Sequence, residues 1–126
     1  MKTIKILLKS IFLILILTVI ACEKPSTDSE LIYIDLGTNF NNDKVKIEIN
    51  NVAKYSETIS TNQTIGLADG VSFDLPVGNS EIKIDIKGIK KTETFVHKKG
   101  RFLYISFEKE NSEIKIIYPE KRFVYD

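Results

Sequence analysis

The sequence is poor in the residues on which most catalytic and metal sites depend. Its 126 residues include one cysteine, Cys22, and one histidine, His97. A single cysteine has no disulfide partner within the chain, and one histidine cannot supply the clustered ligands of a zinc site. No Gly-x-Ser-x-Gly motif is present, and His97 lies among lysines at the end of a predicted strand. We therefore expect a solvated histidine, no metal, no cofactor, no catalytic residue and no enzymatic activity.

The N-terminus lacks an apolar run long enough to cross a membrane. The uncharged stretch from Ser10 to Ala21 has a dozen residues, whereas a spanning helix needs about 20. Lys2, Lys5 and Lys9 precede this stretch, and small or aliphatic residues close it. A basic start, a short apolar middle and a small residue before a cleavage point are the parts of a secretory signal peptide.

The end of this segment, Val19-Ile20-Ala21-Cys22, resembles the lipobox of bacterial lipoproteins. An ordinary signal peptide would normally carry a small residue at position 19, where this chain has valine. The resemblance implies a leader over residues 1–21, cleavage between Ala21 and Cys22, and lipidation of Cys22 by a diacylglyceryl thioether, usually with a third, amide-linked chain. Two or more acyl chains give stable membrane attachment, whereas one alone binds reversibly.

The residue after the cysteine bears on which membrane holds the anchor. It is Glu23, and not the aspartate that such lipoproteins often use to stay at the inner membrane. The resemblance therefore implies the outer membrane. Glu23, Asp28 and Glu30 form a diluted version of the acidic signal that exports some lipoproteins to the cell surface, so both periplasmic and surface exposure stay open.

The mature chain, residues 22–126, has no strong excess of either charge. It carries fifteen basic and seventeen acidic side chains, a net charge of −2. Nucleic-acid binding would require a basic excess on one face, so no such partner is expected. About a hundred residues suffice for a single domain. Residues 22–30 are polar and charged and predict a flexible tether, residues 31–118 a folded domain, and residues 119–126 a C-terminal tail.

Strict alternation of apolar and charged residues indicates the fold class. Val45–Ile49 and Ile82–Ile86 both alternate without an error, which places every aliphatic side chain on one face of a strand. Asn50-Asn51 suits a two-residue hairpin turn, because asparagine tolerates positive φ. The further predicted strands are Leu31–Leu36, Ala53–Ile59, Val71–Leu75, Lys91–Val96, Phe102–Phe107 and Glu113–Tyr118. Seven or eight short antiparallel strands predict an all-β, immunoglobulin-like or transthyretin-like sandwich.

The stretch Phe73–Ile84, with Leu75-Pro76-Val77-Gly78 before an alternating strand, resembles the signature of transthyretin-like, carboxypeptidase-regulatory and PEGA-type sandwich domains. In those families, a loop with proline and glycine carries the chain from one sheet to the other. The resemblance covers residues 67–89 at most and supports the fold, but transfers no functional residue.

Two polar segments are candidate sites with ordinary structural alternatives. The loop from Gly37 to Asp43 is rich in the side-chain oxygens that calcium prefers, yet asparagine and aspartate are also turn formers. A basic cluster near one predicted hairpin could meet anionic lipid or polysaccharide, or it could protect a sheet edge from pairing. Its members are Lys87, Lys90, Lys91, Lys98, Lys99 and Arg101.

Aromatic rings near predicted loops are the remaining candidates. Phe40, Tyr55, Phe123 and Tyr125 could contact a protein or glycan partner, although most aromatics of a sandwich fill its core. The expected function is therefore that of a lipid-anchored, non-catalytic binding or structural module with a protein or glycan partner. The alternatives are an accessory subunit of an outer-membrane assembly, an inhibitor that presents Leu67–Val71 as a protruding loop, or a small envelope enzyme.

Overall fold

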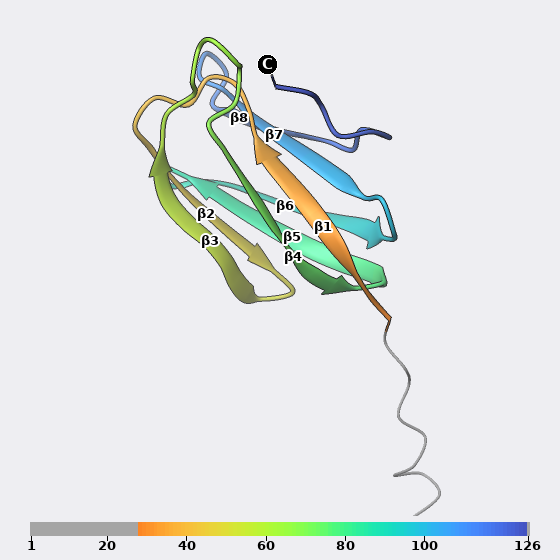
Figure 1. Ribbon diagram of the computed structural model, residues 1–126. Coiled ribbons are helices and arrows are strands. Elements are labelled where there is room, and N and C mark those ends of the chain that lie inside the picture. Colours follow the sequence, from red (N-terminus) through yellow and green to blue (C-terminus); the bar gives the residue numbers. More distant parts are fainter. Residues whose placement is uncertain (1–27, 126) are drawn as a thin grey trace, which may run out of the picture.

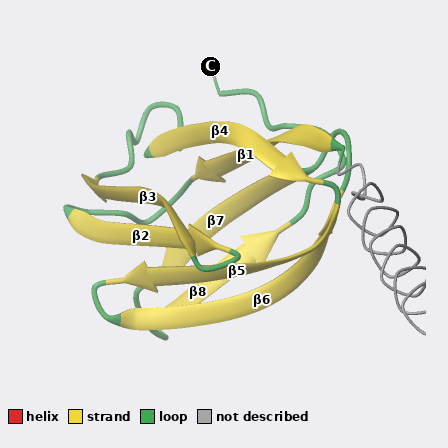
Figure 2. Ribbon diagram, turned by 90° about the horizontal axis from the view of Figure 1, so that it is seen from below, coloured by secondary structure: helices red, strands yellow, loops and turns green. Residues whose placement is uncertain are grey.

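The computed structural model describes residues 28–125, and these residues form a two-layer β-sandwich without helices. Figure 1 shows the strands crossing the molecule in two layers, and Figure 2 shows the same layers from below. The predicted leader, its cleavage point, Cys22 and most of the predicted tether lie outside the described residues. In the described part of the chain, no helix is long and apolar enough to cross a membrane.

The eight predicted strands are all present. They are β1 (Ser29–Leu36), β2 (Asp43–Ile49), β3 (Val52–Ile59), β4 (Asp69–Pro76), β5 (Gly78–Ile86), β6 (Ile89–His97), β7 (Phe102–Glu108) and β8 (Glu113–Ile117). β1 begins at Ser29, so the last two residues assigned to the tether belong to a strand. The all-β sandwich predicted from the alternation is confirmed.

The strands divide into two four-stranded sheets. The β1 sheet has the order β4-β1-β7-β8, and the β2 sheet has the order β3-β2-β5-β6. Most neighbouring strands are antiparallel, but β1 and β7 pair in parallel, from Tyr33 opposite Phe102 to Leu36 opposite Ile105. This pair differs from the expected antiparallel arrangement. Parallel neighbours require a long connection between them. Here the chain between β1 and β7 forms all four strands of the β2 sheet and also β4.

The core lies between the two sheets and consists mainly of isoleucine. β2 alternates buried and exposed residues over its whole length, as its sequence predicts. Ten of the seventeen buried core residues are isoleucines. β-Branched side chains are stiff and pack well on a pleated surface, which suits a core that has no disulfide.

The connections between strands lie at the two ends of the sandwich. We call the end where β1 begins the entry end, and it also carries the turns at Asn50-Asn51, at Val77 and at residues 98–101. Asn50 and Asn51 both have positive φ, 52° and 64°, as predicted for this turn. Pro76 ends β4 in one sheet and Gly78 begins β5 in the other, so this loop does carry the chain between the sheets. The opposite, or loop, end carries residues 37–42, 60–68, 87–88 and 109–112.

Candidate functional site

A polar groove of about 800 Å³ lies at the loop end, between the β1–β2, β3–β4 and β7–β8 connections. It is formed by loops that are distant in sequence but are brought together by the parallel pairing of β1 and β7. The lining residues are Asn39, Phe40, Asn41, Ser60, Thr61, Gln63, Glu108, Lys109, Glu110 and Asn111.

Three hydrogen bonds hold the base of the groove together. The hydroxyl of Thr61 donates to the carbonyl of Gly37 at 2.7 Å and accepts from the N–H of Phe40 at 3.0 Å. The N–H of Thr61 in turn donates to the carbonyl of Phe40 at 2.9 Å. These three bonds fasten the β1–β2 loop to the β3–β4 loop. They also direct the ring of Phe40 into the core, where it is only 2% exposed.

A buried carboxylate joins the groove to the rest of the loop end. Asp43, which is fully buried, lies 2.6 Å from the amine of Lys87 and 3.8 Å from that of Lys109. Its other polar contact is the N–H of Asn41, at 2.9 Å. Burial alone would raise the pKa of Asp43, but the hydrogen bonds from Lys87 and Asn41 and the charge of Lys109 outweigh it and lower the pKa.

This arrangement bears directly on the loop from Gly37 to Asp43, whose side-chain oxygens are compatible with either a calcium site or an ordinary turn. The carboxylate of Asp43 faces two lysines, which neutralise it without a metal. Within residues 28–125, no group of three or more histidine, cysteine, aspartate or glutamate side chains could hold a metal ion. Asn39 and Asn42 adopt positive φ, 73° and 53°, so at least part of the asparagine content serves the turn.

The rim of the groove presents amide groups to solvent. Asn39, Asn41, Gln63 and Asn111 are exposed around it. Each amide offers two donors and one acceptor, so the rim suits a ligand with many hydroxyl or peptide groups.

The four aromatic residues proposed as partner contacts do not come together. Phe40 belongs to the core, so the prediction that it contacts a partner at the surface is wrong. Tyr55 is half-buried, packs against the core and donates to Asp69 at 2.6 Å. Burial and the neighbouring Asp69 raise its pKa. Phe123 and Tyr125 lie in the tail, on the outer face of the β1 sheet.

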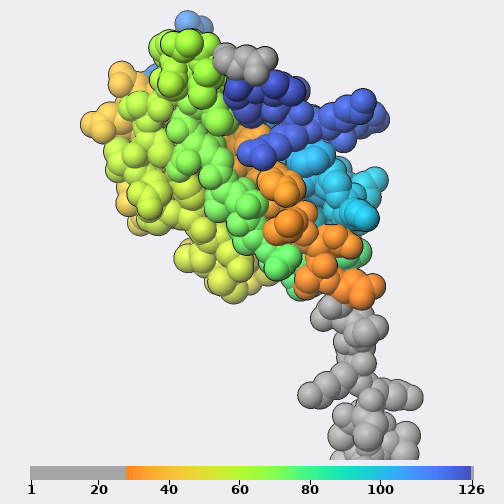
Figure 3. Space-filling view, viewed as in Figure 1, coloured from red at the N-terminus to blue at the C-terminus, as the bar shows by residue number. Residues whose placement is uncertain are grey.

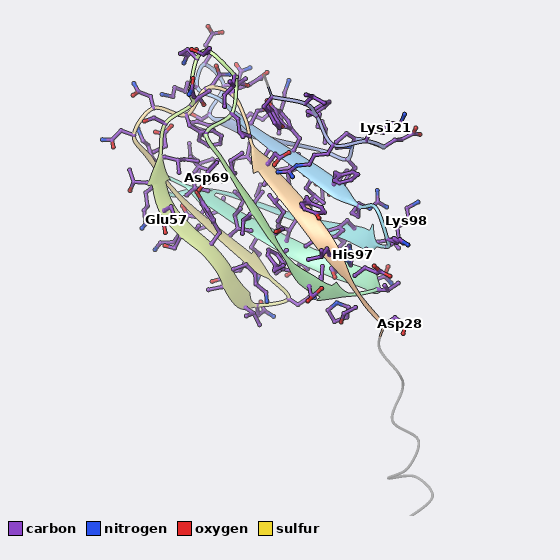
Figure 4. All side chains as sticks on the ribbon, viewed as in Figure 1. Asp28, Glu57, Asp69, His97, Lys98 and Lys121 are labelled. Atoms are coloured by element: carbon purple, nitrogen blue, oxygen red, sulfur yellow. The ribbon has the colours of Figure 1, made fainter. Side chains whose placement is uncertain are left out.

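The histidine is placed differently from its predicted position. His97 is fully buried, and its Nε2 lies 2.9 Å from the carbonyl oxygen of Glu30. Among the described residues, its Nδ1 has no hydrogen-bond partner. The ring therefore connects the end of β6 to the start of β1, one strand from each sheet, and the expectation of a solvated histidine is wrong. In Figure 4, its label lies near those of Asp28 and Lys98 at the entry end.

The basic cluster is divided between the two ends of the molecule. Lys87 lies at the loop end and pairs with Asp43, while Lys98, Lys99 and Arg101 follow β6 at the entry end. The nine residues of β6 separate the groups by about 30 Å. The cluster is therefore not one surface, because residues close in sequence diverge along an extended strand.

The loop proposed as an inhibitory element is not a protruding loop. Leu67 forms a bridge with Asn62, and β4 already begins at Asp69, so Leu67–Val71 runs into the β1 sheet. The connection that does extend from the sandwich, residues 60–66, lies beside the groove.

Sequence reasoning missed Asp35, and it considered Asp43 only as one oxygen-bearing residue of the Gly37–Asp43 loop, although their carboxylates are nearly and fully buried. A weak signal existed for Asp35, since it interrupts the apolar run of β1 at a position that faces outward. Its partner, Arg122, is 87 residues away and carries no local signal.

Comparison with known proteins gives no functional assignment. No family model and no curated protein matches the chain. Among solved structures, a protein from Eubacterium rectale determined by NMR is similar, with a TM-score of 0.45 and 19% identity over 76% of this chain and 93% of that one. A "putative cell adhesion protein" from Bacteroides ovatus has a TM-score of 0.39 and 15% identity over 78% of this chain and 46% of its own. Similarity at this level does not indicate a function.

Proposed function

We propose that the chain is a lipid-anchored protein of the outer membrane and serves as a non-catalytic binding module. Its loop-end groove would contact a polar protein or glycan partner in the periplasm or at the cell surface. The observation that carries the proposal is the position of the groove at the end of the sandwich opposite the point where the chain enters.

The direction of β1 explains why the groove lies opposite the point where the chain enters the sandwich. The strand starts at the entry end and runs to the first loop of the groove over eight residues, a distance of about 26 Å. A lipid on Cys22 would therefore hold the entry end toward the membrane and the groove away from it. Figure 1 shows β1 starting at the end of the sandwich opposite the connections that line the groove.

The chemistry of the groove favours binding over turnover. Its exposed amides provide hydrogen-bond donors and acceptors. Of its two carboxylates, Glu108 is paired with Lys115 at 2.7 Å and Glu110 is exposed to solvent. The histidine lies at the other end of the molecule. Hydrogen-bonding groups on a base that is itself held by hydrogen bonds suit recognition of a polar surface.

The groove is tested with a triple variant, Asn41→Ala, Gln63→Ala and Asn111→Ala, because all three side chains are exposed and none has positive φ. The matched control, Ser72→Ala, Asn79→Ala and Thr94→Ala, removes exposed polar groups elsewhere. Wild type and control should retain the same envelope protein or glycan in a pull-down, and the groove variant should lose it. Equal retention by all three proteins contradicts the groove as the contact.

The anchor is tested separately with Cys22→Ser in cells labelled with palmitate. We expect loss of the label and an uncleaved or mislocalised precursor. Unchanged labelling would refute the lipid anchor while leaving the groove experiment intact.

A further inference from the structure

The outer face of the β1 sheet contains a notch built around one carboxylate. Asp35 points outward from β1, between the inward-facing Ile34 and Leu36, yet it is only 3% exposed. Its neighbour across the β1–β4 pair is Gly70, which has no side chain to fill the space. A Cβ at Gly70 would lie 3.1 Å from Asp35 Oδ1 and 3.5 Å from the guanidinium of Arg122. Glycine at this position therefore makes room for an ion pair.

The described part of the C-terminal tail, residues 119–125, occupies the notch through side chains. Arg122 donates to both oxygens of Asp35, from Nη2 at 3.0 Å and from Nε at 3.2 Å. The hydroxyl of Tyr125 donates to Asp35 Oδ2 at 3.1 Å. A two-point contact of guanidinium with carboxylate is directional and stronger than a neutral hydrogen bond.

Aromatic rings complete the contact. The guanidinium of Arg122 lies 5.0 Å from the ring centre of Tyr33, and Phe123 meets Tyr104 edge-on with ring centres 5.0 Å apart. Tyr104 can lie across the end of β1 because residue 37 is glycine, where a Cβ would collide with its ring. In Figure 3, the dark blue tail lies against the orange surface of β1.

The attachment of the tail differs from that of every strand. Within residues 28–125, no backbone–backbone hydrogen bond joins the segment after Tyr118 to the sandwich. Val124 is 81% exposed and Phe123 is 42% exposed. Tyr118 itself is fixed, since its hydroxyl donates to Glu93 at 2.8 Å. The chain can therefore leave the sheet after Tyr118 without breaking a ladder bond.

From this geometry we infer that the notch is a docking site for the C-terminal tail of a second copy of this chain. The contacts of Arg122, Phe123 and Tyr125 are the same whether the tail comes from its own sandwich or from another. Exchange of tails between two copies therefore leaves the energy of these contacts unchanged. The local concentration of the protein then sets the balance between the self-docked monomer and the exchanged dimer. Pro119–Lys121 span about 10 Å at most, so the two sandwiches must lie side by side.

The test mixes two full-length variants, purified in detergent, that cannot pair with themselves. The donor, Asp35→Asn, has a disabled notch and an intact tail. The acceptor, Arg122→Ala with Phe123→Ala, has an intact notch and a disabled tail. Each alone should sediment as a monomer, and the mixture should form a 1:1 dimer whose fraction rises with concentration. A donor that also carries Arg122→Ala is the matched control and should form none.

Absence of a dimer in the mixture at high micromolar concentration, with both variants folded by circular dichroism, overturns the inference. If Asp35→Asn does not fold, Gly70→Val replaces it as the donor, because valine fills the notch and suits an exposed strand position. A dimer that also forms with the control would show association through another surface and would overturn the inference equally.

Discussion

Asp43 at the loop end and Asp35 on the β1 sheet are both buried carboxylates beside cationic side chains, but they join different parts of the molecule. Asp43 contacts Lys87 and Lys109, which belong to two other connections of the sandwich itself. Asp35 contacts Arg122, which belongs to the tail, and the described tail residues, 119–125, make no backbone hydrogen bond to the sheets. The first ion pair is part of the fold, whereas the second joins the fold to a detachable segment. Burial of a charge therefore does not by itself reveal whether its contact is structural or exchangeable.

The largest effect on stability is expected from Asp43→Asn. This change leaves two lysines without their carboxylate at a site that ties three connections together. Loss of one partner from a buried pair commonly costs 3–5 kcal/mol, but both lysines are about half exposed and can be solvated, so we expect about 2 kcal/mol. Urea unfolding measures the change, with Glu57→Gln, an exposed site on β3, as the control. A loss as small as that of the control would contradict a structural role.

The acid dependence of stability should differ between wild type and Asp43→Asn. The pKa of Asp43 is lowered in the folded state, so its carboxylate stabilises the fold above the unfolded value near 3.8. That contribution is lost as the pH falls through the lower, folded pKa. We expect the difference between the two proteins to hold from neutral pH down to about pH 4, to shrink below that and to vanish only below the folded pKa of Asp43, since protonated aspartate resembles asparagine. Free energies of unfolding at a series of pH values provide the measurement, and a constant difference would speak against this origin.

The smallest effect on global stability is expected from Asp35→Asn, about 0.5–1 kcal/mol, because Arg122 is nearly half exposed and the tail crosses no strand ladder. Its effect on the tail should be much larger. Trypsin should cut after Lys121 or Arg122 several-fold faster than in wild type, while the sandwich resists. Mass spectrometry of timed digests reports both. Unchanged cleavage of the tail would mean that Asp35 does not hold it.

The local alternation of apolar and charged residues, together with the turn residues, predicted most of the fold. Val45–Ile49 and Ile82–Ile86 alternate in the sequence and alternate between core and surface in β2 and β5. The turn at Asn50-Asn51 also followed from local chemistry. These predictions succeed because a strand with one buried face has a period of two, and that period is visible within a few residues.

Predictions about single side chains failed where long-range packing decides the environment. Phe40 lies among asparagines and was a candidate for a partner contact, but the bonds made by Thr61 turn its ring into the core. His97 lies beside lysines, yet the start of β1 covers it completely. In both cases, the neighbours in sequence are exposed and the neighbours in space are not.

The class of the fold, the positions of its strands and the resemblance of the N-terminus to a lipobox can be inferred from the amino-acid sequence alone, because each depends on residues within a short window. The parallel pairing of β1 with β7, the meeting of three loops in one groove and the contact of Arg122 with Asp35 become visible only in the folded protein. Those outcomes depend on which strands become neighbours. That choice is made by the packing of two sheets as a whole and leaves no periodic trace along the chain.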